Sequence, residues 1–398
     1  METGRGLGSR AMLLAFAALA ATSLFADMAY EGARSVLGPY LESLGAALVV
    51  AGAVSVGDLV SYAARFLGGE LAQRLASPRA YWGLTFLGYI VNLAAVPLLA
   101  LAGEWWLAFA LVIVERTGKG LRTAPRDAIL AEVTQGIPRG LAFSLHELAD
   151  QAGAVSGALL VAAELRGHGY KHAYAMLAIP AALALASLSA AYAAYPRPRE
   201  ARLAAGRRGG SLPEGLARVA LAAGLGMAAL MHWAQASYRL YARGVTGVEV
   251  ALLYSAAMLS DALLAVPLGA LYDRAPTASL SLGPLLSAAA TATLLLSASP
   301  IPGAVLWGAA MAAYETSYRA AMAGAPEGAR ARAYAALYAS MGAGWAAGNL
   351  VMSLLPPRAA AALAVAAGLA GAAVLLAPPS SEEEEGYYLA CRILWGRR

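Results

Sequence analysis

The chain has 398 residues, of which 60% are hydrophobic and 13% charged, and its formal net charge at pH 7 is +5. Charged residues make up about a quarter of an average soluble domain, so this composition excludes an ordinary soluble protein of two or three domains. The basic residues do not gather on a soluble domain, which argues against a nucleic-acid partner. The single cysteine, Cys391, excludes an internal disulfide.

Apolar segments of about 20 residues, the length that crosses a bilayer as a helix, recur along the chain. When the N-terminus is placed inside and the segments alternate, most of the 29 Lys and Arg residues fall on the inner side. The positive-inside rule then places both termini in the cytoplasm. We therefore predict an all-α, multi-pass protein of the cytoplasmic membrane with twelve spans, which begin near Ala11, Gly45, Tyr81, Trp105, Leu141, His172, Leu216, Val248, Ala278, Ile301, Ala333 and Arg358.

One long polar segment, PRPREARLAAGRRGGSLP at 196–213, interrupts the apolar pattern. Its proline, glycine and arginine content is typical of a loop, here a cytoplasmic linker. It divides the chain into two predicted six-helix bundles, 1–195 and 214–378. A cytoplasmic tail follows at 379–398, and its arginine residues fit a segment that lies on the inner membrane surface.

The two halves share an internal repeat. GGELAQR at 68–74 recurs as LGALYDR at 268–274, and the pair Glu115 and Lys119 recurs at the same spacing as Glu315 and Arg319. After a loop the spacing shortens once, and from there Arg139, Gly153 and Gly157 match Arg330, Gly344 and Gly348. We interpret the glycine pairs as helix-packing surfaces. Six spans return the chain to the same side, so the two halves would run parallel.

The repeated GxLxDR pattern after the second and eighth spans resembles the inner-loop motif of the major facilitator superfamily (MFS). In that family the glycine allows close helix approach, and the Asp and Arg hold the inner ends of the two halves together. The second copy is complete, whereas the first has Gln73 where the pattern has Asp. The residues that match are Gly69, Gln73, Arg74, Gly269, Asp273 and Arg274.

Other segments extend this resemblance over nearly the whole chain. Arg116 and Gly120 are similar to the family's RxxxG element, and Gly153 and Gly157 to the GxxxG part of its exporter motif, with Ala158 where the usual Pro would follow. The fourth span, with its pattern ERxGKGxRxxPRD, resembles one prokaryotic branch of the family, as do ADMAYEG and FSLHELADQAGAVSG. The resemblance implies two parallel six-helix bundles with the substrate held between them.

Ionisable residues inside the predicted spans are costly in a bilayer, and they normally face a partner or a wet cavity. Many of them recur at helical spacing, so that they share a face. In the resembled fold, spans one, four, seven and ten line the transport path. We therefore predict a proton-coupling and transport site that consists of Asp27, Glu31, Glu115, Arg116, Lys119, His146, Asp150, Glu315 and Arg319.

A coupling mechanism follows as a hypothesis. Asp27, Glu31 or Asp150 would take up a proton, because carboxyl groups in apolar surroundings favour their neutral form. Protonation would weaken their pairing with Arg116 or Lys119 and allow the halves to rock.

His146, one turn from Asp150, would relay the proton.

The same residues also allow a purely structural interpretation. Glu115 with Lys119, and Glu315 with Arg319, have the spacing of helical salt bridges that neutralise each other. The remaining charged residues would then sit at a solvated helix end or in a latch between the halves (Arg122, Arg126 and Asp127), in helix packing (Asp58 and Asp261) or in a packed wall (His232).

Several functions are compatible with this pattern, the first being proton-coupled export of a small apolar or amphipathic compound by an efflux antiporter. The second is uptake of a small anionic metabolite, attracted by Arg116, Lys119 and Arg319. The third is export of a metal or metal chelate through Asp27, His146 and Asp150, with His232 as a further ligand. An intramembrane zinc hydrolase at His146, Glu147 and Asp150 is a fourth, from another class. We expect a monomeric secondary transporter rather than an enzyme, with no cofactor and no resident metal.

Overall fold

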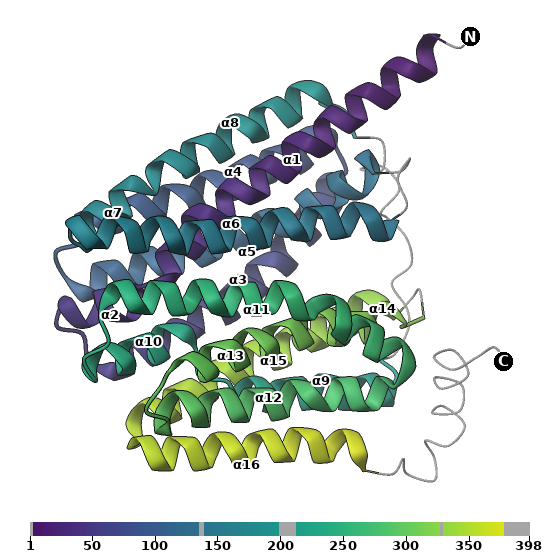
Figure 1. The fold of residues 1–398 in the computed structure, drawn as a ribbon. Helices are drawn as coiled ribbons and strands as arrows, with labels where there is room; N and C mark the ends of the chain where they lie inside the picture. The colour runs from purple at the N-terminus through teal and green to yellow at the C-terminus, as the bar shows by residue number, and fades with distance from the viewer. Residues whose placement is uncertain (1–2, 135–138, 199–211, 327–328, 378–398) are drawn as a thin grey trace. The chain divides into compact units, whose positions relative to one another are not determined.

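The computed structural model describes residues 3–134, 139–198, 212–326 and 329–377. The tail predicted at 379–398 and most of the linker predicted at 196–213 lie outside these residues. Every regular element of the described part is helical (Figure 1). In chain order the helices are α1 (Thr3–Ser35), α2 (Leu37–Ser43), α3 (Leu48–Leu75), α4 (Pro78–Leu98), η1 (Leu99–Leu101), α5 (Trp105–Val133), α6 (Arg139–Gly167), α7 (Tyr170–Met176), α8 (Ala178–Ala194), α9 (Glu214–Ala229), α10 (Trp233–Ala242), α11 (Gly247–Arg274), α12 (Pro276–Leu296), α13 (Ile301–Ala313), the π-helical η3 (Tyr314–Tyr318), α14 (Arg319–Ala323), α15 (Arg330–Leu354) and α16 (Pro357–Leu376).

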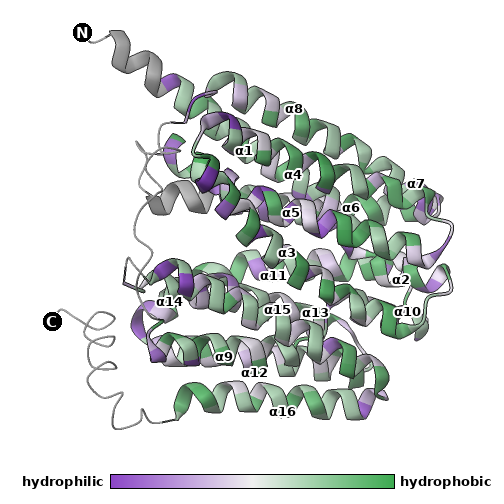
Figure 2. Cartoon of the chain, turned by 180° about the vertical axis from the view of Figure 1, so that it is seen from behind, coloured by the Kyte–Doolittle hydropathy of each residue, from purple (hydrophilic) through white to green (hydrophobic). Residues whose placement is uncertain are grey.

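Many of these helices suit a bilayer. Hydrophobic residues cover most of α16, for example (Figure 2), and large apolar side chains such as Phe66 and Val266 are 63% and 78% exposed, as expected of a surface that meets lipid. Within the described residues, nine segments are long and apolar enough to cross a membrane: Arg10–Ser35, Leu48–Leu75, Pro78–Leu101, His146–Gly167, Tyr170–Ala194, Glu214–Ala242, Gly247–Arg274, Pro276–Leu296 and Pro357–Leu376. The multi-pass, all-α prediction is confirmed, while the count of twelve spans and the side of the termini stay predictions.

The helices group into two compact units. The first comprises Met1–Ala46, Val60–Gly206 and Gly244–Ser255, and the second Ala47–Leu59, Arg207–Arg243 and Ala256–Arg398. In the first unit α1 packs against α6 and α8, and α4 packs against α5. In the second unit α9 packs against α15 and α16, and α12 packs against α13. In each unit, therefore, the first predicted span packs against the fifth and the sixth, and the third packs against the fourth.

Glycines set the closest of these contacts. A Cβ atom at Gly157 of α6 would meet the backbone carbonyl of Met28 on α1, and one at Gly348 of α15 would meet that of Ala228 on α9. Gly153 and Gly344 approach Leu24 and Gly224 in the same way. Small residues let membrane helices approach until their backbones touch. The repeated glycines of the sequence thus lie at equivalent helix crossings in the two units.

Turns at equivalent places in the two halves also rely on glycine. Gly45 has φ +76° and Gly244 has φ +93°, backbone conformations that cost glycine little. Nearby side chains satisfy helix ends: the Tyr40 hydroxyl donates to the carbonyls of Leu99 and Ala102 at 2.7 and 3.0 Å. The Tyr40 hydroxyl thus ties α2 to the end of η1, where the Leu99 carbonyl also accepts from the Ala102 N–H.

Candidate functional site

The predicted charged residues of the first unit gather where α1, α4, α5 and α6 meet. Helix α5 supplies a line of cations on one face: Arg116, Lys119, Arg122 and Arg126. Arg116 and Arg122 are only 1% and 3% exposed. Because buried charges normally have partners, the surroundings of each cation show what it does.

Glu31 on α1 is the centre of an ion-pair network. Its Oε1 atom lies 2.7 Å from Nη1 of Arg34 and 3.5 Å from Nζ of Lys119. Its Oε2 atom accepts a 2.5 Å hydrogen bond from the Tyr254 hydroxyl. The Lys119 ammonium also lies 4.1 Å from the centre of the Tyr30 ring, a cation–π contact. The fold thus brings Glu31 of α1 and Lys119 of α5 together. The sequence suggested a pairing of the acids with Arg116 or Lys119, but not which residues pair.

Asp27 and Asp150 form a second acidic group. Asp27 accepts a short hydrogen bond from Tyr30. The Cβ atom of Asp27 lies 3.0 Å from the position that a Cβ of Gly153 would take. Gly153 lies one helical turn after Asp150 on α6, and the carboxyl groups of Asp27 and Asp150 interact electrostatically. In the described part of the chain, neither acid has a Lys or Arg nitrogen within ion-pair distance. These two acids are therefore less neutralised than Glu31.

His146 shares its ring nitrogen with an arginine. Nη1 of Arg126 lies 2.7 Å from Nε2 of His146 and 2.9 Å from Oγ of Ser23. A guanidinium can only donate, so Nε2 acts as an acceptor. Asp150 Oδ1 is further away, at 3.9 Å. Nε2, the ring nitrogen that faces Asp150, thus already accepts from a cation, which argues against a zinc ion between His146 and Asp150.

Glu115 and Arg116 form a buried pair with Asn92 of α4. Oε2 of Glu115 lies 2.9 Å from Nη1 of Arg116, and its Oε1 accepts a 2.8 Å hydrogen bond from Nδ2 of Asn92. Asn92 also donates to the Glu115 main-chain carbonyl at 3.2 Å. The pair holds α4 against α5, at the place where Gly118 allows backbone contact with Asn92.

Arg122 differs from the other cations of α5. Its guanidinium carbon lies 3.9 Å from the centre of the Tyr89 ring and 5.8 Å from that of Tyr30. Its Nε atom is buried without a hydrogen-bond partner. Among the described residues, no carboxylate pairs with this side chain. The sequence placed Arg122 at a helix end or between the halves, and its two aromatic neighbours could not be read from the spacing.

The second unit contains a break in a predicted span. Helix α9 ends at Ala229 and α10 begins at Trp233, so some backbone groups between them, such as the Met231 N–H and the Leu230 carbonyl, lack helical hydrogen bonds. Side chains from three other helices satisfy these groups. Thr291 of α12 accepts from the Met231 N–H at 2.8 Å. The indole of Trp307 of α13 donates to the Met231 carbonyl at 2.9 Å, and that of Trp345 of α15 donates to the Leu230 carbonyl at 2.9 Å. Broken membrane helices whose freed backbone is bonded by neighbours are typical of transporter binding sites.

Two polar side chains of this break were not among the predicted site residues. His232 caps α10 by accepting from Ala234 N–H through Nδ1 at 3.1 Å, which leaves Nε2 to donate to Asp58 Oδ2 at 3.1 Å. Gln235 is fully buried, and both its amide atoms lack a partner among the described residues. The sequence signal that could have pointed here was the polar cluster inside an otherwise apolar span.

The remaining predicted residues lie elsewhere. Glu315 is in the π-helical turn η3 and Arg319 begins α14, so they follow a wider turn than the α-helix assumed from the sequence, and π-helical turns are frequent at functional sites. Arg74 pairs with Glu70 at 2.8 Å in an exposed ion pair. The other residues of the inner-loop motif lie at the ends of α3 and α11, and these are Gly69, Gln73, Gly269, Asp273 and Arg274.

The sequence has relatives that match it over part of its length. An uncharacterized protein of Mycobacterium tuberculosis is 35% identical over 313 residues, which cover 75% of this chain and 76% of that protein. An uncharacterized MFS-type transporter of Methanocaldococcus jannaschii is 31% identical over 162 residues, 40% of this chain and 38% of its own. The multidrug resistance protein MdtH of Cronobacter sakazakii is 32% identical over 122 residues, 30% of this chain and 29% of its own. No family model matches the chain.

Solved structures share the fold. A crystal structure of the peptide transporter POT has a TM-score of 0.73 at 15% identity, and 95% of each chain is covered. The nucleoside transporter NupG has a TM-score of 0.71 at 14% identity, with 91% of this chain and 99% of NupG covered. The chain therefore belongs to the same family as the Mycobacterium tuberculosis protein, it has the fold of the POT and NupG transporters, and part of its length is similar to an MFS-type transporter.

Proposed function

We propose that the chain is a secondary active transporter that exports a small molecule across the cytoplasmic membrane by alternating access, in exchange for protons. The observation that carries the proposal is the pair Asp27 and Asp150. These acids come from two helices that touch at Gly153, and in the described part neither has a Lys or Arg partner at ion-pair distance. Protonation of either acid would remove a buried charge without breaking a direct ion pair, which suits a site that takes up and releases protons.

The neighbouring cations would link protonation to movement. Asp27 also interacts electrostatically with Lys119, which pairs with Glu31. Neutralising Asp27 would leave Lys119 more strongly drawn to Glu31, and thus alter the contacts between α1 and α5. The export direction is supported by MdtH, a partial relative that is named as a multidrug resistance protein.

A reconstituted system tests the coupling. The purified chain is placed in liposomes that contain a pH-sensitive dye, and pools of candidate substrates are added outside. We expect substrate entry to drive protons out, which is the sign of antiport. Asp27→Asn and Asp150→Asn should abolish the proton signal, whereas Glu104→Gln, an exposed acid in front of α5, should leave it unchanged.

The other outcomes separate the alternatives. Protons that move in the same direction as the substrate would replace export with uptake by symport. Substrate movement without any proton signal, equal in wild type and both Asn variants, would refute proton coupling and leave Asp27 and Asp150 with a structural role.

A second candidate, uptake of a small anionic metabolite, has one specific observation in its favour. Arg122 is a buried guanidinium that no carboxylate of the described residues neutralises, held in place by the face of Tyr89. An arginine fixed in this way is suited to a planar carboxylate or a phosphate. The candidate is tested by comparing an acidic substrate with its uncharged amide in the same liposomes, where only the acid should compete for transport.

A further inference from the structure

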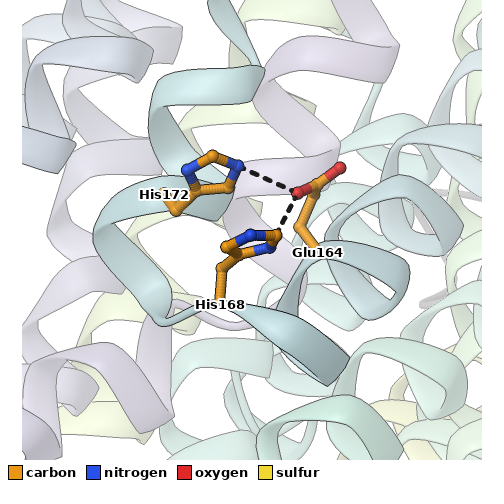
Figure 3. A group of neighbouring side chains, drawn as sticks. All are labelled: Glu164, His168 and His172. Carbon is orange, nitrogen blue, oxygen red and sulfur yellow. Dashed lines mark ion pairs between the residues drawn. The ribbon is translucent and has the colours of Figure 1, made fainter.

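Three potential metal ligands meet where α6 ends and α7 begins. Glu164 lies on the last turns of α6, His168 follows the end of that helix, and His172 is in the first turn of α7 (Figure 3). Oε2 of Glu164 lies 3.6 Å from Nδ1 of His168 and 3.1 Å from Nε2 of His172. Among the described residues, these three form the one group of at least three His, Cys, Asp or Glu whose ligand atoms all lie within 4.8 Å of one another.

Two of the three spacings between the ligand atoms fit a tetrahedral ion. Zinc binds imidazole nitrogen and carboxylate oxygen at about 2.0–2.2 Å, so two ligand atoms of a tetrahedral site lie about 3.4 Å apart. The two measured distances from Glu164 Oε2 lie close to that value. Two histidines and one carboxylate also leave a fourth position for water or another ligand.

The local fold brings together one imidazole from the connection after α6 and one from the first turn of α7. Gly169 precedes α7 and turns the chain so that the rings of His168 and His172 stack, with centroids 4.1 Å apart and an angle of 24° between their planes. Both side chains are exposed, by 57% and 46%, so an ion can reach them from solvent. The stack places one nitrogen of each imidazole near the Glu164 carboxylate. In the described structure, this carboxylate makes no ion pair with a Lys or Arg.

We propose that Glu164, His168 and His172 bind one divalent transition-metal ion, and that zinc fits the site best. The chemistry supports this choice because imidazole and carboxylate ligands in a tetrahedral arrangement favour zinc. This site is separate from the acids proposed for coupling, and it does not depend on the proposed function. A bound ion would connect the end of α6 to α7. Helix α6 also carries Asp150 and the glycines that contact α1, so the ion would restrain a helix of the candidate coupling site.

Zinc binding is tested on the purified full-length chain in detergent, without a polyhistidine tag. After dialysis against zinc, we expect one zinc per chain by elemental analysis, and cobalt should give the intense visible absorption of a tetrahedral site. Glu164→Gln, His168→Ala and His172→Ala should each weaken zinc binding by tenfold or more, measured by calorimetry. Lys171→Ala, an exposed neighbour in the same loop, should bind as the wild type does.

A further variant separates lost ligands from lost structure. His172→Cys keeps a group that binds zinc, so it should recover most of the affinity that His172→Ala loses. The proposal is overturned if the wild type retains no stoichiometric zinc, if the His168→Ala and His172→Ala double variant binds as tightly as the wild type, or if Lys171→Ala weakens binding as much as the ligand variants do.

Discussion

The guanidinium of Arg122 lies over the ring of Tyr89, with 3.9 Å between its Cζ atom and the ring centre. Such a stack fixes the plane of the guanidinium and leaves its N–H groups free of carboxylates in the described structure. Its neighbour one turn earlier, Lys119, is instead engaged by Glu31 and Tyr30. The four cations of α5 therefore have different tasks, although the sequence presents them as one stripe.

The first prediction concerns this arginine. Arg122→Gln removes the charge, and we expect the KM for an acidic substrate to rise about tenfold or more, because hydrogen bonds to charged groups contribute about 1.5–3 kcal/mol. Arg122→Lys keeps the charge but loses the planar arrangement of N–H donors, so its KM should lie between those of the wild type and of Arg122→Gln. Transport of an uncharged substrate should change little in either variant.

Liposome uptake assays measure these constants, with Arg79→Gln as the control because Arg79 is exposed at the start of α4. An equal loss for acidic and uncharged substrates would show that Arg122 supports the fold of α4 and α5 and not an anion.

The second prediction concerns the glycine contact of α6. Gly157→Ala places a methyl group against the Met28 carbonyl, and overpacking of this kind costs about 1–3 kcal/mol. Gly83→Ala is the matched control, since nothing lies within 4 Å of a Cβ at that position of α4. There the change should be neutral or stabilising by up to about 1 kcal/mol.

Thermal unfolding in detergent compares the two variants. Gly348→Ala in the second unit should lower the melting temperature as Gly157→Ala does, because it meets the Ala228 carbonyl in the equivalent crossing. Equal melting temperatures for Gly157→Ala and Gly83→Ala would contradict the close approach of α1 and α6.

Much of this architecture could be predicted from the sequence. Hydrophobic length predicts membrane helices, and the repeated glycines lie at equivalent crossings because a close backbone contact tolerates no side chain. Helical spacing, however, indicates only which residues share a face. It could not show that Lys119 contacts Glu31 on another helix, or that Glu115 contacts Asn92, because those partners are distant in sequence.

The break between α9 and α10 was beyond sequence reasoning for a related reason. The polar residues His232 and Gln235 interrupt the apolar pattern there, but polar residues alone do not show that a helix breaks, and the length of the span favours one continuous helix. The break is stabilised by Thr291, Trp307, Trp345 and Asn349, which lie 60 or more residues further along the chain. Only the folded chain brings these donors and acceptors to the freed backbone groups.

The third prediction separates the two bonds of His232. His232→Asn preserves an N-cap oxygen for the Ala234 N–H but is too short to reach Asp58 as the imidazole does. His232→Ala removes both. We expect a larger loss of stability for His232→Ala, with the difference, about 1 kcal/mol, equal to the contribution of the cap.

The stability that His232→Asn loses relative to the wild type measures the hydrogen bond from His232 to Asp58. His232→Asn should be less stable than the wild type by about 1–3 kcal/mol, because the Asp58 carboxylate loses a buried donor. The unfolding temperatures of His232→Asn, of His232→Ala and of the double variant His232→Asn with Asp58→Asn check these differences in stability. Wild-type stability of His232→Asn would show that the bond contributes nothing.

The fourth prediction concerns Gln235, whose side-chain amide is fully buried without a partner among the described residues. An unsatisfied buried polar group costs about 1–3 kcal/mol, so Gln235→Met, of similar volume and without polar atoms at the end, should raise the melting temperature. If the amide is kept for a substrate, the same variant should transport less or bind its substrate more weakly.

A stabilised variant with unchanged transport would show that Gln235 is a packing defect, and a destabilised one would show that the amide has a partner in the folded protein after all. Melting curves and liposome transport measured on one preparation distinguish these results, because stability and transport are expected to move in opposite directions only where a buried polar group serves a ligand.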